Sequence, residues 1–147
     1  MRTTSPPVLA GRLRLAVTRT ARRLRQQTGA QLSPSLTAAL ATVEHHGPLT
    51  PSEVATRERV QRPTATRLIA RLGEAGLVAR TPDPGDGRSS LVAVTPEGRA
   101  LLERGRTQKD AYLARRLAKL SAAERATLAQ AATILERLLE DEEDEPR

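Results

Sequence analysis

The chain has 147 residues, of which 38% are hydrophobic and 28% charged, a size that suits one domain or one module flanked by helices. Its 24 Lys and Arg outnumber its 17 Asp and Glu, which gives a net charge of +7, and the absence of cysteine excludes disulfides and thiolate metal or redox sites. No apolar run approaches a membrane span and the N-terminus lacks the apolar core of a signal peptide, so we expect a cytoplasmic protein.

The charge is unevenly distributed along the chain. Residues 140–147 hold six acids and one Arg, so they carry −5 and residues 1–139 carry +12. A basic body with an acidic tail indicates a polyanionic partner, most often nucleic acid. The alternative is that the excess of Arg reflects only the codon bias of a GC-rich genome, which favours Arg over Lys. With one Tyr and no Phe or Trp, the helices have to pack through Leu and Ala and would gain from burial in a dimer.

The N-terminal third reads as a disordered segment followed by two helices. Residues 1–7 are expected to be disordered, and a helical pattern then runs from Val8 to about Thr28, where Gly29 is a plausible stop. Ser33 and Pro34 have the character of an N-cap and a first helical residue. The second helix is predicted to end near His46 and to bury four residues: Leu36, Ala39, Leu40 and Val43.

Two further helices follow after a short connector. Thr50 and Glu53 form a predicted capping box for a brief helix from Pro51 to about Arg57, with Val54 and Ala55 facing inward. A turn through residues 58–60 leads to a helix over residues 62–75, which Gly76 ends. The apolar positions of this helix follow the i, i+3, i+4, i+7 spacing that buries one face: Ala65, Leu68, Ile69, Leu72 and Ala75.

The periodicity then changes to that of a β-hairpin. Residues 77–81 and 90–95 are extended in character, and the turn-rich residues 82–88 between them predict a long polar tip. Thr95 is the expected cap of a helix that runs to about Lys119, and Ser121 with Glu124 forms another capping box. The last helix carries Leu128, Ala131, Ala132, Leu135, Leu138 and Leu139, and residues 140–147 form an acidic tail expected to be disordered.

The order of short helix, turn, second helix, Gly and hairpin is that of a winged helix-turn-helix. The predicted fold class is therefore mainly α with a small β-hairpin wing (α+β). The expected regions are a disordered N-terminus over 1–7, a dimerisation helix over 8–32, the DNA-binding winged region over 33–95, C-terminal dimerisation helices over 96–139 and the acidic tail over 140–147.

In such a motif the second helix enters the major groove and its N-terminal residues meet base edges. Its polar face is predicted to bind DNA through Gln61, Arg62, Thr64, Thr66, Arg67 and Arg71. Arg and Gln suit guanine and adenine, and Thr bonds a base or contacts a thymine methyl. We expect Arg62, Thr64, Thr66 and Arg67 at bases and Arg71 at a phosphate; the alternative is an ordinary solvated helix face.

The wing tip contributes one further candidate cation. Arg88 is predicted to enter a minor groove, because a narrow groove concentrates negative potential. Asp86 cannot itself favour DNA, so its expected role is to hold a guanidinium by a charge-assisted bond. Gly85 and Gly87 would permit the sharp turn between the strands.

From Val8 to Leu139 the chain resembles a MarR-family regulator. The most specific segments are LTPSEVA at 49–55, RPTATRLIARL at 62–72, GLV at 76–78, DPGDGR at 83–88 and VAVTPEG at 92–98. The family's wing usually reads Asp-x-Arg-Asp-x-Arg. Gly85 stands in place of the first Arg here, which puts one usual wing phosphate contact in doubt, whereas Asp86 and Arg88 keep the second half of the pattern.

The resemblance implies a homodimer that binds an inverted-repeat operator in double-stranded DNA, with recognition helices about one DNA turn apart. The expected function is a regulator, chiefly a repressor of its own or neighbouring genes. It also implies a possible small anionic or phenolic effector, bound between the dimer helices and the winged region. The predicted dimer-interface residues, each with intrachain core as the alternative, are Leu9, Leu13, Val17, Leu128, Leu135 and Leu138.

Other functions have less support. No nucleophile–base pair, phosphate loop, dinucleotide motif or metal cluster is present in the sequence, so we expect no enzyme, cofactor or metal. We interpret His45 and His46 as two imidazoles near a helix C-terminus, where partial positive charge is favourable, and Tyr112 as a partly packed ring. A role in ligand binding is the alternative for each of them.

A winged module for RNA or protein contact is the competing function. The lack of aromatic rings argues against RNA stacking, and the Arg-rich face argues against a protein interface core.

Overall fold

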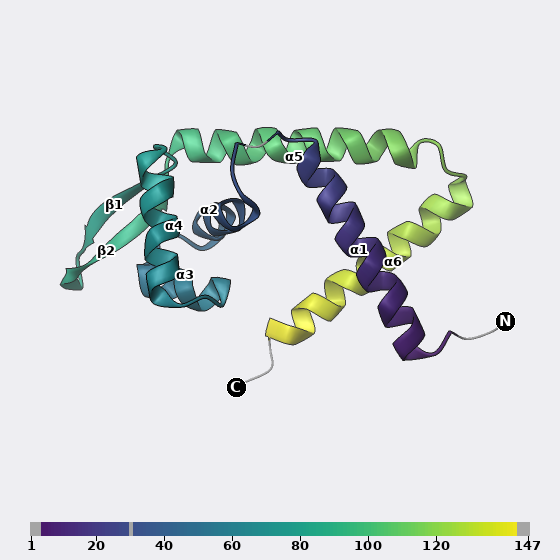
Figure 1. The fold of residues 1–147 in the computed structure, drawn as a ribbon, viewed down its shortest axis with the longest axis horizontal. Coiled ribbons are helices and arrows are strands. Elements are labelled where there is room, and N and C mark those ends of the chain that lie inside the picture. Colours follow the sequence, from purple (N-terminus) through teal and green to yellow (C-terminus); the bar gives the residue numbers. More distant parts are fainter. Residues whose placement is uncertain (1–3, 30, 144–147) are drawn as a thin grey trace. The chain divides into compact units, whose positions relative to one another are not determined.

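The computed structural model describes residues 4–29 and 31–143. The chain divides into two compact units, Met1–Lys109 and Asp110–Arg147, and each is described by itself. The predicted fold class is confirmed: the described residues form helices and a two-stranded hairpin (Figure 1). The elements are α1 (Pro6–Gln26), α2 (Pro34–His46), α3 (Pro51–Glu58), α4 (Arg62–Glu74), β1 (Val78–Asp83), β2 (Asp86–Val94), α5 (Pro96–Leu117) and α6 (Ala122–Glu143).

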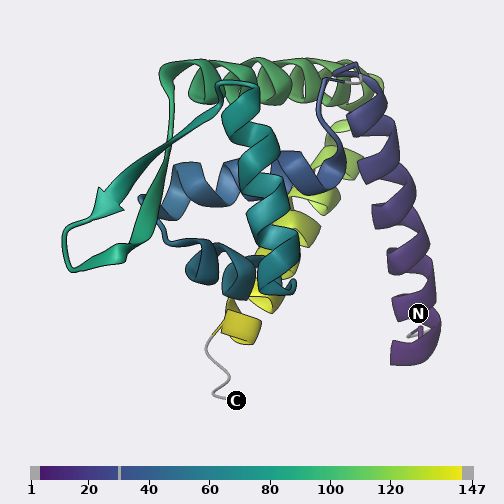
Figure 2. The same cartoon turned by 60° about the vertical axis from the view of Figure 1, so that its left-hand side comes forward.

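The core of the first unit lies where α2, α3 and α4 meet the base of the hairpin. The residues predicted to face inward on these three helices are buried, except that Leu68 is half-buried and Ala75 is exposed. The prediction for Ala75 is wrong because α4 ends at Glu74, which makes Ala75 its C-cap, and Gly76 turns the chain away with φ of 72°. In Figures 1 and 2 the three helices lie together on one side of the hairpin.

The two predicted capping boxes are confirmed by their hydrogen bonds. The backbone N–H of Thr50 donates to Glu53 Oε2 at 2.7 Å, and that of Glu53 donates to Thr50 Oγ1 at 3.3 Å. Ser121 and Glu124 exchange the same pair of bonds at the start of α6, at 2.8 and 3.1 Å. These reciprocal bonds satisfy N–H groups that have no partner inside the helix.

Both ends of the chain are more helical than predicted. α1 begins at Pro6, so the expected disorder of residues 1–7 is wrong for Pro6 and Pro7. Proline suits the first helical turn, where its missing N–H costs nothing. α6 continues to Glu143, into the segment predicted to be a disordered tail, because Glu is a good helix former. Residues 1–3 and 144–147 lie outside the described residues.

The hairpin is the wing of the motif, and its strands are longer than predicted. The antiparallel pairs run from Val78 opposite Val94 to Pro82 opposite Ser90, and after an irregularity the pair Asp83 and Asp86 closes the tip. The long loop expected at the tip is therefore wrong. At the base, Leu49 forms two backbone hydrogen bonds with Val92, at 3.0 and 2.7 Å. This bridge fastens the buried Val92 of the wing to the start of the helix-turn-helix.

Candidate nucleic-acid interface

The recognition helix α4 presents a polar face opposite its buried residues. Because Ala65, Ile69 and Leu72 are buried, the side chains on the far side of the helix are left to solvent. Of the six residues predicted to bind DNA on this helix, Thr64 is half-buried and the others are exposed: Gln61, Arg62, Thr66, Arg67 and Arg71. The structure thus brings three arginines, a glutamine and two threonines to one helix and its N-cap.

The two threonine hydroxyls are engaged within the helix. Thr66 Oγ1 donates to the carbonyl of Arg62 at 3.0 Å, so its proton is used and it offers a ligand an acceptor and a methyl group. Thr64 Oγ1 accepts a long hydrogen bond of 3.4 Å from Arg67 Nη2. This contact lies across one helical turn and directs the Arg67 side chain back along α4.

At the wing tip the two aspartates shape the turn. Asp86 Oδ1 accepts a hydrogen bond from the backbone N–H of Arg88 at 3.0 Å, and Asp83 Oδ1 accepts one from Gly85 at 2.9 Å. Among the described residues Asp86 forms no ion pair, so the prediction that it holds a guanidinium is wrong. A short carboxylate reaches the backbone two residues ahead more readily than a mobile guanidinium. Arg88 is exposed, and its guanidinium forms no ion pair within the described residues.

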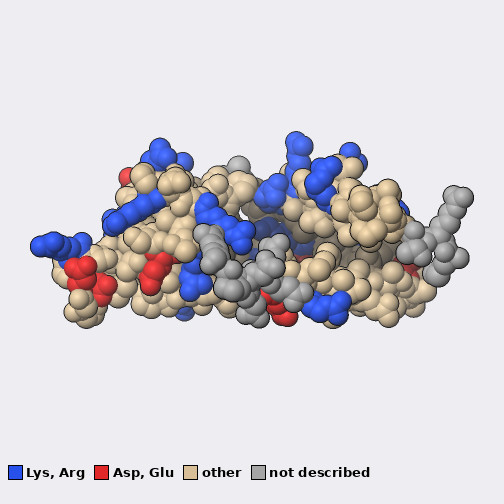
Figure 3. All heavy atoms as spheres, turned by 90° about the horizontal axis from the view of Figure 1, so that it is seen from below, with Lys and Arg blue, Asp and Glu red and all other residues tan. Residues whose placement is uncertain are grey.

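Further cations lie on the same unit. Arg57, Arg59 and Arg80 are exposed beside the recognition helix or on the wing, and the sequence reasoning assigned them no role because they fall outside the polar face of α4. In Figure 3, Lys and Arg side chains project at the wing end, at the left, with acidic side chains next to them. Arginines outnumber acidic residues on α4 and the wing, a balance of charge that favours contacts to phosphates.

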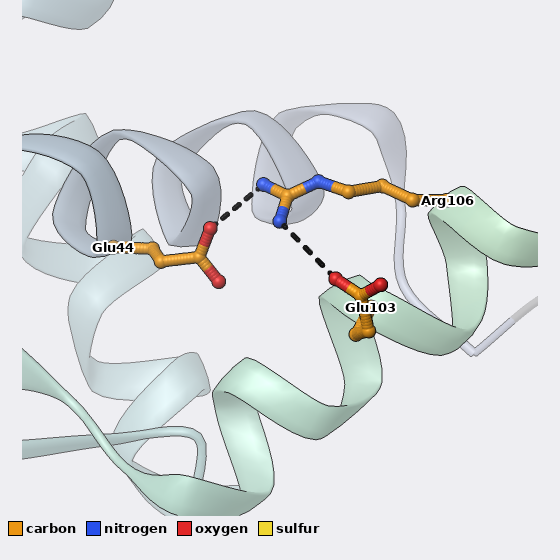
Figure 4. A network of polar contacts seen from close by, with 3 residues as sticks. All are labelled: Glu44, Glu103 and Arg106. Atoms are coloured by element: carbon orange, nitrogen blue, oxygen red, sulfur yellow. Dashed lines mark hydrogen bonds and ion pairs between the residues drawn. The ribbon is translucent and has the colours of Figure 1, made fainter.

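A groove of about 960 Å³ lies in the first unit between the end of α1, the start of α2 and the middle of α5. Its cationic lining residues are Arg22, Arg25, Arg104, Arg106 and Lys109. Figure 4 shows Arg106 between two carboxylates: its Nη2 lies 2.8 Å from Glu44 Oε1 and its Nη1 lies 4.0 Å from Glu103 Oε2. The second oxygen of Glu44 is buried and has no hydrogen-bond partner in the part of the chain that the structure describes. The groove thus carries more positive than negative charge.

The residues predicted for a dimer interface are exposed in the single chain. On α1, Leu9, Leu13 and Val17 are 43%, 38% and 51% exposed. On α6, Leu128, Leu135 and Leu138 are 47%, 36% and 54% exposed. The exposed positions form one aliphatic stripe on α1 and one on α6. Burial in a dimer, with intrachain core as the alternative, stays a prediction for each of these residues.

The remaining candidates are the two histidines at the end of α2 and the single tyrosine. The rings of His45 and His46 make an edge contact with centroids 4.5 Å apart at the end of α2. No group of three or more potential metal ligands occurs in the part of the chain that the structure describes. Tyr112 is half-buried, and its hydroxyl accepts hydrogen bonds from Arg116. Over the same described residues, no helix is long and apolar enough to span a membrane.

Comparison with known proteins places this geometry among transcription regulators. Residues 32–90 match the profile of the MarR family. The chain is 41% identical over 134 residues to the HTH-type transcriptional regulator MT0903.1 of Mycobacterium tuberculosis, covering 90% of this chain and 94% of the relative.

Two solved structures share the fold. A Pseudomonas aeruginosa PA01 protein assigned as a transcriptional regulator superposes with a TM-score of 0.82 and 34% identity, covering 93% of this chain and 97% of that one. Wild-type MarR of E. coli in its apo form superposes with a TM-score of 0.72 and 26% identity, covering 90% and 98% of the two chains.

Proposed function

Because this chain belongs to the MarR family of DNA-binding transcription regulators, we propose that it acts as a homodimer that binds an inverted-repeat operator and represses its own or neighbouring genes. The observation that carries the proposal is the exposed Arg and Thr face of α4 next to the wing with its exposed Arg88. Membership of this family points to regulation rather than catalysis.

The side chains of α4 divide into base contacts and backbone contacts. Arg62 and Arg67 stand in the first half of the helix, which enters the major groove, and each can donate two hydrogen bonds to one guanine. Thr64 and Thr66 offer acceptors and methyl groups of a size that suits thymine. Arg71 lies in the last turn of α4 and suits a phosphate at the edge of the groove.

A dimer is supported by the two aliphatic stripes on α1 and α6. The leucines and valines of these stripes are exposed to water in the single chain. Covering them with a second copy lowers the free energy of the system by about 25 cal/mol for each Å² of apolar surface buried. A twofold dimer also doubles the DNA contacts and matches the symmetry of an inverted repeat.

An effector is supported by the groove of about 960 Å³, whose five cationic side chains suit an anion. Of these, Arg106 is already paired with Glu44, so we expect the other four cationic side chains to bind the anion. We expect a small carboxylate or phenolate to bind there and to lower operator affinity by favouring a dimer with a different spacing of the recognition helices. Isothermal titration that finds no binding by a panel of such anions would contradict this part of the proposal.

The central experiment measures binding to the DNA upstream of the protein's own gene by fluorescence anisotropy across a salt series. We expect one inverted repeat to bind at least about 1,000-fold more tightly than random duplex. Arg67→Ala should cost about 1–3 kcal/mol on that site and relax its base preference. Arg88→Ala should weaken binding and reduce its salt dependence.

The opposite result is weak binding of equal strength to all duplexes. Selection of bound fragments from the whole genome then separates a distant operator from a protein without operator specificity. Competition by single-stranded and structured RNA, if stronger than by duplex DNA, would favour the RNA-binding alternative.

A further inference from the structure

The turn between α3 and α4 holds an arginine in an unusual backbone conformation. Arg59 follows the last residue of α3 and has φ of 53° and ψ of 42°. Among the described residues it is the one non-glycine position with positive φ; the others are Gly29 and Gly76. The left-handed region favours glycine because a Cβ atom there crowds the neighbouring carbonyl oxygen. The sequence therefore carries a large side chain where a glycine would be less strained.

The neighbouring residues explain why the backbone takes this conformation. Glu58 accepts a hydrogen bond from the hydroxyl of Thr42 on α2. Val60 packs against the core, and its N–H donates to the carbonyl of Ala55 at 3.0 Å. With the residues on both sides held inward, the chain has to turn at position 59. This accounts for the left-handed conformation, and it leaves the choice of arginine unexplained.

The guanidinium of Arg59 does not contribute to folding by any contact within the described residues. The side chain is exposed, and no hydrogen bond or ion pair of its guanidinium occurs in that part of the chain. The adjacent carboxylate of Glu58 is directed to Thr42. A strained residue with a free charge is typical of a functional position, since strain of this kind persists where the side chain has another use.

The position of the turn indicates the use. Arg59 lies three residues before Arg62, the first residue of the recognition helix, and three residues span at most about 10 Å. The major groove is about 12 Å wide, with phosphates along both edges. When the start of α4 meets the bases, the turn lies beside one of these edges, where the first helix of such a motif crosses the backbone. We propose that Arg59 binds a DNA phosphate flanking the groove; this inference rests on the DNA-binding function proposed above.

The test compares Arg59→Gly with Arg59→Lys in the full-length protein. Glycine removes both the charge and the strain, so the urea midpoint of unfolding should rise while DNA affinity falls by about fivefold for each contact at 0.15 M salt. The slope of log K against log salt should decrease by about 0.9 for each contact. Lysine keeps the charge, so both affinity and slope should stay near those of the wild type.

Two DNA probes and one control variant make the outcome specific. A phosphate contact carries no sequence information, so the loss in Arg59→Gly should be equal on the operator repeat and on a random duplex. Arg19→Ala, which removes an exposed charge from α1, should leave the salt slope unchanged.

An Arg59→Gly protein that binds both probes with wild-type affinity and slope overturns this inference and leaves the proposed function standing. Wild-type protein that binds random duplex but no operator overturns operator specificity, while Arg59 is still tested on the random probe. A wild type that binds neither overturns both.

Discussion

Gly98 shows how one missing side chain positions the wing. A Cβ atom at Gly98 would lie 2.2 Å from the carbonyl oxygen of Leu77 and 2.9 Å from Cγ2 of Val94. The first turn of α5 therefore packs directly on the base of the hairpin. We predict that Gly98→Ala destabilises the protein by about 1–3 kcal/mol, because the backbone of Leu77 has to move. Urea denaturation followed by circular dichroism measures the change.

The same helix supplies a control of opposite sign. A Cβ atom at Gly105 would meet only Cγ2 of Thr28, at 3.9 Å. Gly105→Ala should stabilise the protein by about 0.5–1 kcal/mol, since glycine inside a helix loses more conformational entropy than alanine. If both variants shift the midpoint in the same direction, the close approach to Leu77 is not the cause of the first effect.

The structural role of Asp86 leads to a prediction about charge. Its carboxylate holds the backbone N–H of Arg88 and also repels phosphates. Asp86→Asn keeps the acceptor and removes the charge, so DNA affinity should be equal to or higher than that of the wild type. Asp86→Ala loses the acceptor and should weaken binding, because the wing tip becomes less ordered. Anisotropy titrations of both variants decide between the roles; weaker binding by the asparagine variant would show that the negative charge itself is needed.

At the scale of single elements, α3 depends on its capping box. Thr50 and Glu53 exchange two hydrogen bonds at the start of a helix of eight residues, which is too short to be stable by propensity alone. We predict that Thr50→Ala lowers the free energy of unfolding by about 1 kcal/mol, while Thr50→Ser, which keeps the acceptor, changes it little. Equal losses in the two variants, measured by urea denaturation, would assign the effect to the threonine methyl group instead.

The elements that sequence reasoning predicted correctly are those fixed by local chemistry. The caps at Ser33, Thr50, Thr95 and Ser121 depend on residues three positions apart, and each is present. The buried faces of α2, α3 and α4 follow from helical spacing, which one sequence displays in full.

Some of the incorrect predictions concern pairings with distant parts of the chain, while those for Pro6, Pro7 and Ala75 concern where a helix begins or ends. The strands reach the wing tip and Leu49 pairs with Val92, and neither pairing leaves a local signal. The hydrogen bond of Asp86 depended on a turn geometry that the sequence left open. The sequence likewise predicted only a turn at Arg59. The left-handed backbone there follows from the contacts of Glu58 with Thr42 and of Val60 with the core, which the sequence does not display.

At the scale of the whole molecule, the aliphatic stripes of α1 and α6 are the feature that a single chain leaves unexplained. In a twofold dimer each interface residue appears twice, so one substitution acts on two copies. We predict that the double variant Leu13→Glu and Leu135→Glu raises the dimer dissociation constant at least about 100-fold, because burying each unpaired carboxylate costs several kcal/mol. Sedimentation velocity over a concentration series measures the shift from dimer to monomer.

Leu15 provides the matched control for this prediction. It is 44% exposed, against 38% for Leu13, and lies about 200° further around the helix, on the opposite side of α1. Leu15→Glu adds the same charge to the same helix and should leave the dimer intact. Operator affinity should follow dimerisation, since a monomer contacts one half-site and loses the second set of arginines. If the double variant remains dimeric, the two chains associate through another surface; if it is monomeric with unchanged operator affinity, the repeat is bound by independent monomers.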